Sequence, residues 1–335
     1  MEPPHLTPQK IFETLGAFRD TAAMRTAIEL DVFTVIGEGA ASASEIAKRC
    51  SASERGIKKL CNYLTMLGFL ERKDDSYLQS RDAATFLDRC SPAYLGASAS
   101  EAITGKALVA AFSTLTEAVR KGGTALAGGG TLAPEHPVWV EFARAMAVPG
   151  MLLARMLADC LREPVDRPRK ILDIAAGHGL YGIEFARRNP RAEIFAVEWQ
   201  QVLDVALGNA VKAGVSERFH SIPGDALSVE FGDGYDLALI TNFLPDLGST
   251  EGLLKRIHSA LTEEGRVALF ELMLNRDQVS PRAAVGLDLT LLATTPCGET
   301  RTATQLSAAL RRAGFDRVEI REVRPAPNRL AIAHR

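Results

Sequence analysis

A glycine-rich turn with an aspartate beside it is the first feature of the chain that could do chemistry. In the stretch "ILDIAAGHGLYGIEF", residues 171–185, an apolar run containing Asp173 leads into the pattern Gly177-x-Gly179-x-x-Gly182. Glycines let the backbone approach a ligand closely, and a helix N-terminus binds anions, so the spacing fits the pyrophosphate of a nicotinamide or flavin nucleotide. A carboxylate at Asp173, however, disfavours a pyrophosphate and favours a cationic ligand that carries an ammonium and a sulfonium.

Two further acids follow the next two apolar runs. Glu198 ends the second run, 19 residues past Gly179, where an acid accepts hydrogen bonds from ribose hydroxyls. Asp225 follows Gly224 after the third run, where a carboxylate can accept a hydrogen bond from the exocyclic amine of adenine. Each acid alone is ordinary at the end of a strand. Three in register after a Gly-x-Gly turn favour S-adenosylmethionine over a dianionic pyrophosphate.

Alternating strand and helix patterns from about residue 167 onward would position these acids. Apolar runs such as "KILDIA", "AEIFAVEW" and "YDLALITNF" predict strands with helices between them, so we expect an α/β, doubly wound, mostly parallel sheet. Ligands bind such sheets beyond the carboxyl ends of the strands, where the acids fall. The last two runs, 315–323 and 328–335, have a short proline-containing connection, which predicts that one of them runs antiparallel at the sheet edge.

Residues 10 to about 120 are predicted to be mainly helical. Ser44 and Ser53 are the expected N-caps of two helices, and a hairpin is expected around Asp74 and Asp75, an order typical of a winged helix-turn-helix. Residues 1–100 carry 12 lysines and arginines against 13 aspartates and glutamates, which argues against nucleic acid as the partner. The apolar stripe within 11–36 exceeds what so small a module can bury, which favours dimerisation.

The overall composition limits the classes of protein. With 335 residues the chain is long enough for two domains, and its net charge of -2 attracts neither nucleic acid nor an anionic membrane. Five scattered cysteines and six dispersed histidines favour reduced thiols and predict no metal site. The N-terminus lacks an apolar signal core and no run reaches the ~18 apolar residues of a membrane span, so we expect a cytoplasmic protein without a membrane partner.

Six stretches together resemble a known family. In this order and spacing, "RTAIELDVFTVI", "GFLERKDDSYLQS", "ILDIAAGHG", "GDAL", "TNFLPDL" and "TRTATQLSAALRRAGF" are similar to the class I S-adenosylmethionine-dependent methyltransferases, specifically small-molecule O-methyltransferases with an N-terminal winged-helix dimerisation domain. The resemblance implies a seven-stranded sheet, the cofactor S-adenosylmethionine and a homodimer formed through the N-terminal domains. It also implies a dimerisation domain at 1–100, linker and substrate-pocket helices at 101–166, and a methyltransferase domain at 167–335.

The resemblance further implies which residues hold the cofactor. The glycine turn would carry the methionine part, Glu198 would bind ribose, and Asp225 would lie by the adenine. Trp199 and Ala226 would line the adenine slot, Trp199 by stacking. The full set of expected cofactor-binding residues is Asp173, Gly177, Gly179, Glu198, Trp199, Asp225, Ala226 and Asn242.

The chain departs from the family pattern in the loop after the fourth predicted strand. The family usually carries a histidine there as general base toward a substrate hydroxyl, whereas "NFLPDLG" places Pro245 in that slot and Asp246 after it. Glu271 matches an acid that orients the histidine in the family, while Thr300 takes the slot of a second acid and Glu299 lies one place off. Asp246 or Glu271 is therefore the candidate catalytic base. An acceptor that ionises readily, or an electron-rich carbon acceptor, are alternatives.

An acceptor pocket is expected beside two helices predicted at 136–148 and 150–163, after a glycine-rich loop or hinge at 121–137. The expected substrate-contacting residues are Trp139, Phe142, Met146 and Phe243. They favour a small, largely apolar or aromatic acceptor, which we expect to be methylated at oxygen. The alternatives are a carbon methyltransferase, a non-catalytic cofactor-binding winged-helix regulator and a nicotinamide oxidoreductase.

Overall fold

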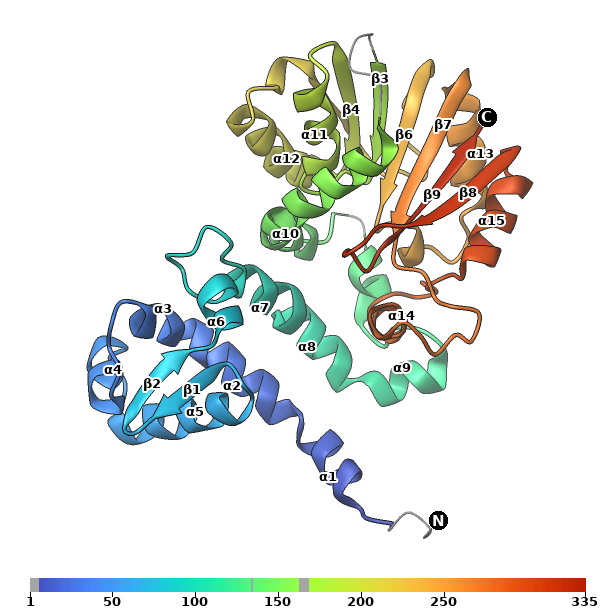
Figure 1. Cartoon of the computed structure of the whole chain (residues 1–335). Coiled ribbons are helices and arrows are strands. Elements are labelled where there is room, and N and C mark those ends of the chain that lie inside the picture. Colours follow the sequence, from blue (N-terminus) through green and yellow to red (C-terminus); the bar gives the residue numbers. More distant parts are fainter. Residues whose placement is uncertain (1–5, 134, 163–168) are drawn as a thin grey trace, which may run out of the picture. The chain divides into compact units, whose positions relative to one another are not determined.

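The computed structural model describes residues 6–133, 135–162 and 169–335, and the chain divides into two compact units, Met1–Gly105 and Lys106–Arg335 (Figure 1). The first unit is mainly helical and the second contains a large sheet. The glycine-rich segment 121–137, which the sequence suggested as a loop or hinge, lies inside the second unit.

The N-terminal unit contains the predicted order of two capped helices followed by a hairpin. Its elements are α1 Gln9–Gly16, α2 Phe18–Glu29, α3 Val32–Gly37, α4 Ala43–Arg49, α5 Glu54–Met66, β1 Leu70–Lys73, β2 Ser76–Gln79, α6 Arg81–Phe86 and α7 Gly96–Thr104. Ser53 caps α5 through the amide of Gly56, as predicted. The predicted cap Ser44 is wrong, because Ser42 and Glu45 form a capping box and the N-cap of α4 is therefore two residues earlier.

The second unit contains a seven-stranded, mostly parallel sheet, as predicted. Its strands are β3 Arg169–Ile174, β4 Ala192–Glu198, β5 Phe219–Pro223, β6 Tyr235–Thr241, β7 Leu261–Glu271, β8 Arg317–Glu322 and β9 Arg329–His334, in the order β5-β4-β3-β6-β7-β9-β8. Its helices are α8 Lys106–Ser113, α9 Leu115–Lys121, η1 Ala127–Leu132, α10 Val138–Leu161, α11 Leu180–Arg188, α12 Gln200–Lys212, η2 Ser216–Arg218, η3 Leu244–Asp246, α13 Glu251–Ala260, α14 Arg282–Thr294 and α15 Ala303–Arg312.

The antiparallel strand is not at the sheet edge, so that part of the prediction was wrong. β9 pairs antiparallel with both β7 and β8 and therefore lies inside the sheet, while β8 forms the edge. The reason lies in composition. Residues 330–333 of β9 are apolar and buried, whereas in β8 exposed charged residues alternate with the partly buried Val318 and Ile320. A strand buried on both faces has a continuous apolar run, and a charged strand protects an edge.

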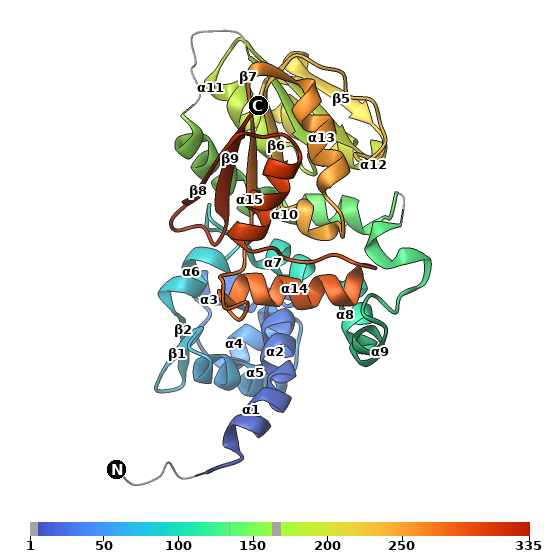
Figure 2. The same ribbon diagram turned by 90° about the vertical axis from the view of Figure 1, so that its right-hand side faces the viewer.

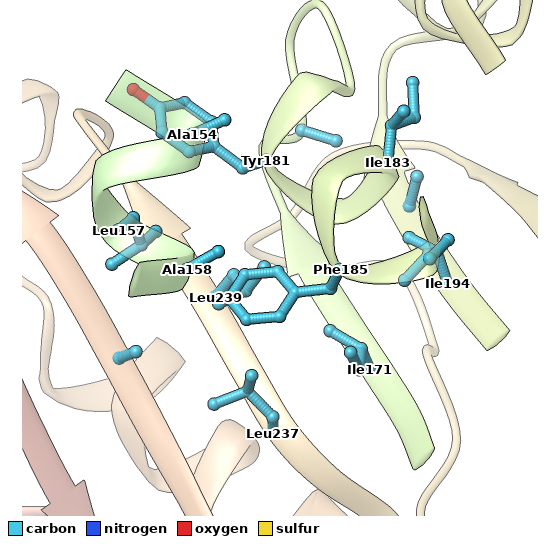
Figure 3. Close-up of a cluster of buried hydrophobic side chains, with 14 of the residues drawn as sticks. Ala154, Leu157, Ala158, Ile171, Tyr181, Ile183, Phe185, Ile194, Leu237 and Leu239 are labelled. Carbon is cyan, nitrogen blue, oxygen red and sulfur yellow. The ribbon is translucent and has the colours of Figure 1, made fainter. Parts of the chain in front are cut away.

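Helices cover both faces of the sheet and bury two separate apolar layers. Figures 1 and 2 show α10, α11 and α12 against one face, with α13 and α15 against the other. Alternate residues of β3 take part in each layer, since Ile171 packs under α10 and α11 while Leu172 packs on the opposite side. Figure 3 shows the first layer, where Leu157 of α10 and Phe185 of α11 lie above Leu237 and Leu239 of β6.

Helix α10 is one continuous helix of 24 residues, where the sequence predicted two segments. Pro149 lies inside it; proline removes one backbone hydrogen bond and usually ends or bends a helix. The helix nevertheless continues through Pro149, and the half after it packs on the first apolar layer through Ala154, Leu157 and Leu161. The local signal of the proline therefore does not end the helix.

Two threonines attach the segment after α9 to the C-terminal end of α14. The hydroxyl of Thr124 donates to the carbonyl of Ala293 at 2.7 Å, and that of Thr131 donates to the carbonyl of Thr294 at 3.2 Å.

Within the described part of the chain, no single helix has the length and apolar character to cross a membrane; one bent pair, Gly96–Ser113 with Leu115–Lys121, meets these criteria by length and composition only.

Candidate functional site

The predicted glycine turn lies between the carboxyl end of β3 and the start of α11. Gly177 and Gly179 have φ angles of 54° and 71°, and the turn enters through Ala175, whose φ of 52° is rare for a residue with a side chain. A Cβ atom at Gly179 would lie 2.8 Å from Cβ of Ala206, so only glycine allows α12 to approach the turn this closely. The local sequence thus builds a tight backbone turn at the carboxyl edge of the sheet.

Glu198 ends β4 beside this turn and bonds to it. One of its carboxylate oxygens accepts the amide of Gly177 at 3.1 Å, and the other accepts the amide of Trp199 at 2.9 Å. Burial raises the pKa of the carboxyl, while these two amides lower it. Each carboxylate oxygen has a further lone pair, so Glu198 can also accept hydroxyl donors.

Asp173 lies beneath the turn, more deeply than the sequence suggested. It is fully buried in β3, and one carboxylate oxygen accepts the amide of Gly182 in α11 at 3.1 Å. The other oxygen, Oδ1, is buried and has no hydrogen-bond partner in the described structure. Burial raises the pKa of Asp173 to about 7, against the effect of the Gly182 amide. Such an unsatisfied acceptor is suited to a cationic or hydrogen-bond-donating group.

Asp225 and Ala226 form a turn immediately after β5. Asp225 accepts the amide of Leu227 through Oδ1, and its carbonyl accepts the amides of Ser228 and Val229. Ala226 is buried, and Trp199 is partly buried at the N-cap of α12. Because β3, β4 and β5 are neighbours in the parallel sheet, the three predicted acids lie at the same edge.

These residues fit S-adenosylmethionine. The glycine turn offers close backbone approach, Asp173 offers an unsatisfied acceptor, and Glu198 and Asp225 follow adjacent strands. Gly177 and Gly179 would carry the methionine part, and Trp199 and Ala226 would line the base. Among the described residues, no group of three or more histidine, cysteine or acidic side chains is placed to hold a metal ion.

Asn242 begins the other half of this edge, after β6. Its φ is 53°, and its side-chain oxygen accepts a hydrogen bond from the side-chain amide of the buried Asn328 at 2.7 Å. Burial raises the pKa of Tyr181, a residue drawn in Figure 3, and the neighbouring Asn242 side chain lowers it. Asn242 therefore connects the loop after β6 with α11 of the cofactor half.

The residues that take the place of the family histidine form the short helix η3. Pro245 is buried, and Asp246 is partly buried at the end of the element. Burial raises the pKa of the Asp246 carboxyl to about 7, an effect that its own backbone amide reduces. A carboxylate with a pKa near neutrality suits general base catalysis at that pH.

Glu271, the other predicted base, faces the backbone of this loop. Its Oε1 accepts the amides of Phe243 and Leu244 at 3.1 and 3.2 Å, while Oε2 is buried without a hydrogen-bond partner in the described structure. Only 3% of the residue is exposed, and burial raises the pKa of its carboxyl to about 8. A cavity of about 10 Å3, room for roughly one water, adjoins it. This geometry favours a role in holding the loop over direct contact with an acceptor.

Arg301 holds the same loop from its other side, and sequence reasoning missed it. Its guanidinium donates to the carbonyl of Leu244 at 2.9 Å, of Leu247 at 2.7 Å and of Gly248 at 3.0 Å. The Glu299 amide donates to the carbonyl of Pro245 at 2.8 Å. Thr300 is buried; its amide donates to Asp288 Oδ1 at 2.6 Å, while its hydroxyl has no partner among the described residues. The position of Arg301 in "CGETRT", next to the altered acid slot, was the available signal.

The structure brings together only part of the predicted acceptor wall. Trp139 and Phe142 of α10 meet edge to face with ring centroids 5.9 Å apart, and the indole N–H of Trp139 donates to the carbonyl of Thr131 at 2.8 Å. Phe142 is 41% exposed, and Met146 is partly buried on the same helix. Phe243 instead packs against the apolar layer on the other side of the sheet.

His178, inside the glycine turn, is a second residue that sequence reasoning missed. Its Nδ1 accepts the amide of Leu180 at 3.2 Å, and its ring stacks on Tyr181 with centroids 5.5 Å apart. A Cβ atom at Gly150 of α10 would lie 2.2 Å from Nε2, so glycine at 150 makes room for the ring. Burial lowers the pKa of His178 to about 4, which keeps it neutral. His178 thus attaches the turn to α10.

Comparison with known proteins agrees with this geometry. Residues 12–89 match the O-methyltransferase dimerisation domain and residues 112–316 match the O-methyltransferase domain. A solved protein of Nostoc punctiforme, described as a candidate O-methyltransferase, is 40% identical with a TM-score of 0.93 over 98% of this chain and 99% of that one.

Two better characterised proteins are more distant. Human N-acetylserotonin methyltransferase, solved with S-adenosylmethionine, shares the fold with a TM-score of 0.83 at 20% identity, over 100% of this chain and 99% of that one. The 3-hydroxy-5-methyl-1-naphthoate 3-O-methyltransferase of Streptomyces sahachiroi is 27% identical over 319 residues, 91% of this chain and 88% of the relative.

Proposed function

The chain belongs to the S-adenosylmethionine-dependent O-methyltransferase family with an N-terminal dimerisation domain, and from this premise we propose that it methylates a hydroxyl oxygen of a small, largely apolar or aromatic molecule, with Asp246 as the base. One observation carries the proposal. The loop that bears Asp246 is held on both sides by buried polar bonds, although the histidine position itself is proline. Such fixation would keep Asp246 at a constant place relative to the acceptor.

The cofactor half would bind and orient the methyl donor. When bound, S-adenosylmethionine supplies an electrophilic methyl group on its sulfonium sulfur. Glu198 accepts the ribose hydroxyls, Asp225 accepts the adenine amine, and the unsatisfied Oδ1 of Asp173 favours the cationic end. These contacts place the methyl carbon, and in-line displacement gains most of its acceleration from such proximity and orientation.

Asp246 would complete the reaction in the acceptor half. The acceptor oxygen forms the new C–O bond as the C–S bond breaks, and Asp246 removes the hydroxyl proton. Its pKa of about 7 keeps a large fraction of the carboxyl ionised at neutral pH while it retains useful basicity. Proline cannot accept a proton, so Pro245 can only shape the loop.

Apolar side chains of α10 support the acceptor class. Trp139, Phe142 and Met146 suit an aromatic guest, and the indole N–H of Trp139 already bonds to backbone, whereas Phe243 packs on the other side of the sheet. The naphthoate-methylating relative acts on an aromatic hydroxyl by its name, which supports the same class.

Methylation at carbon is the second candidate, and it is favoured by one observation. The family histidine is replaced by Pro245. An electron-rich aromatic carbon attacks the methyl group first and loses its proton afterwards, so it depends less on a base in the transition state. The product distinguishes the two, because proton NMR separates an O–CH3 signal from a C–CH3 signal.

We also propose a homodimer through the N-terminal unit. Helix α1 buries none of its residues in the chain, and Ile11, Phe12 and Leu15 are 62%, 67% and 71% exposed. Apolar patches of this kind mark interaction surfaces. Sedimentation velocity is expected to give twice the chain mass of 36.1 kDa, and a monomeric mass at micromolar concentration would contradict the proposal.

Asp246→Asn tests the proposed base. With naphthols and hydroxynaphthoates as acceptors, we expect kcat to fall about 10²–10⁴-fold, the range typical of a lost general base. The wild-type kcat should rise with pH around 7, and the variant should lose this rise. Asp316→Asn, an exposed aspartate of the same unit, is the matched control. Wild-type kcat in Asp246→Asn, with unchanged affinity for S-adenosylhomocysteine, would exclude Asp246 as the base.

A further inference from the structure

The turn after β5 satisfies its own amides but not its own carbonyls. Asp225 accepts the amides of Leu227, Ser228 and Val229 through its side chain and carbonyl. The carbonyls of Ala226 and Val229 have no partner inside the turn and bond instead to a residue of α13. The turn that carries Asp225 therefore depends on a side chain 31 residues further along the chain.

That residue is Arg256. One guanidinium nitrogen donates to the carbonyl of Ala226 at 3.0 Å, and the other donates to the carbonyl of Val229. The guanidinium carbon also lies 4.6 Å from the ring centroid of Phe231, a cation–π contact. Three points of the segment 226–231 are thus fixed by one planar group. Lysine could not reproduce this, since its ammonium is a single charge without a planar fork.

The fixed segment adjoins the proposed adenine end of the cofactor site. Asp225 directly precedes Ala226, and the Gly224 amide donates to the carbonyl of Glu198 at 3.0 Å, which joins the turn to the proposed ribose end. Ala226 itself is buried. A displacement of the Ala226 carbonyl by loss of its donor would consequently move the Asp225 carboxylate.

We propose that Arg256 is a positioning residue for the cofactor: through the carbonyls of Ala226 and Val229 it sets where Asp225 meets the exocyclic amine of adenine. The inference rests on the role of Asp225 in the proposed function. Arg256 touches neither cofactor nor acceptor in this account. It acts only through the turn.

Arg301 provides a matched control within the same unit. It also donates to carbonyls of a loop after a strand, those of Leu244, Leu247 and Gly248, but its loop carries Asp246 and not Asp225. Arg256→Lys and Arg301→Lys therefore remove the same kind of bonds from the two loops. General loss of stability affects both variants, whereas loss of adenine recognition affects only the first.

The experiment compares binding of S-adenosylhomocysteine with that of S-inosylhomocysteine, whose base lacks the exocyclic amine. By calorimetry, the wild type should prefer the adenine form, and Arg256→Lys should weaken S-adenosylhomocysteine about five- to twentyfold. The preference should shrink in Arg256→Lys and persist in Arg301→Lys. Because binding is measured without an acceptor, the result does not depend on the identity of the substrate.

Asp225→Ala, which removes the side-chain acceptor, separates failure of this inference from failure of the site. If the wild type does not distinguish the two nucleosides and Asp225→Ala binds normally, the adenine role of Asp225 is overturned, and the inference with it. If Asp225→Ala loses the preference but Arg256→Lys keeps it, only the inference is overturned. Phe231→Leu, which removes the ring beneath the guanidinium, is the second variant should Arg256→Lys not fold, with a smaller loss of preference expected.

Discussion

The two halves of the carboxyl edge of the sheet have the same scaffold but different chemistry. In the cofactor half, Glu198 accepts the Gly177 amide of the glycine turn, and Arg256 holds carbonyls of the turn after β5. In the acceptor half, Glu271 accepts amides of the loop after β6 and Arg301 holds its carbonyls. The acceptor half nevertheless carries Pro245 where the family resemblance expects a histidine.

This difference teaches that the bonds that hold the loop can be retained while the side chain at the histidine position changes. The cofactor half must recognise one fixed nucleoside, so its acids fall where the family pattern expects them. The acceptor half needs only a loop held at a fixed place, which buried bonds to backbone provide whatever side chain reacts. Variants that affect one half and leave the other intact test this separation.

The largest expected effect in the cofactor half is that of Glu198→Ala. This variant removes the proposed acceptor for ribose and the bond to the Gly177 amide together, so we expect the affinity for S-adenosylhomocysteine to fall at least about 100-fold. Isothermal titration measures it. Glu193→Ala, an exposed glutamate on the same strand, is the control and should bind normally. An affinity of Glu198→Ala within threefold of that of the wild type would contradict the proposal that Glu198 binds the ribose of the cofactor.

Glu271→Gln should have a smaller effect and sharpen the comparison in the acceptor half. Glutamine keeps an oxygen that can accept the amides of Phe243 and Leu244. If Glu271 only positions the loop, kcat should therefore fall less than about tenfold in this variant. Glu271→Ala should lower kcat far more, with affinity for S-adenosylhomocysteine unchanged in both variants. Steady-state kinetics with a naphthol acceptor measure the difference. If Glu271→Gln loses as much kcat as Asp246→Asn, Glu271 is itself the base.

The sequence predicted where the three acids lie better than how the loops are held, for a physical reason. Asp173 lies within the apolar run of its strand, and Glu198 and Asp225 follow the next two runs, so in a parallel sheet their positions suffice to place them at one edge. Arg256 and Arg301 bond to main-chain carbonyls that lie 27 to 57 residues away. Carbonyls are present at every residue, so the sequence does not identify these partners, although "CGETRT" drew attention to the neighbourhood of Arg301.

Other differences between sequence and structure arose where packing decides. The continuity of α10 through Pro149 and the position of β9 inside the sheet depend on which apolar faces meet, which local signals do not report. His178 is a similar case, because the space for its ring exists only where Gly150 of α10 lies against the turn.

The remaining expected effects are on the stability of the fold and not on binding or kcat, and the buried groups of the two halves contribute to them with opposite dependence on pH. The pKa of Glu271 is raised from 4.5 to about 8, so its contribution to stability is present below pH 4.5 and is lost as pH rises to about 8. The pKa of His178 is lowered from 6.5 to about 4, so its contribution is present above pH 6.5 and is lost as pH falls to about 4. One such group changes the free energy of unfolding by about 1.4 kcal/mol per pH unit within its range.

Urea unfolding midpoints between pH 4 and pH 9 measure both effects, in two variants that each replace one of these titrating side chains. Glu271→Gln should remove a fall in stability between pH 4.5 and 8. His178→Asn, which keeps an acceptor near the Leu180 amide, should remove a rise in stability between pH 4 and 6.5. The two effects have opposite signs where their ranges overlap, so each is read from the difference between the variant and the wild type. Asp173 adds a loss of its own as pH rises from 3.8 to about 7, and this loss persists in both variants. If the two variants changed the pH profile in the same direction, the buried groups of the two halves would titrate as one coupled cluster, and the separation of cofactor and acceptor chemistry would not extend to the protons they hold.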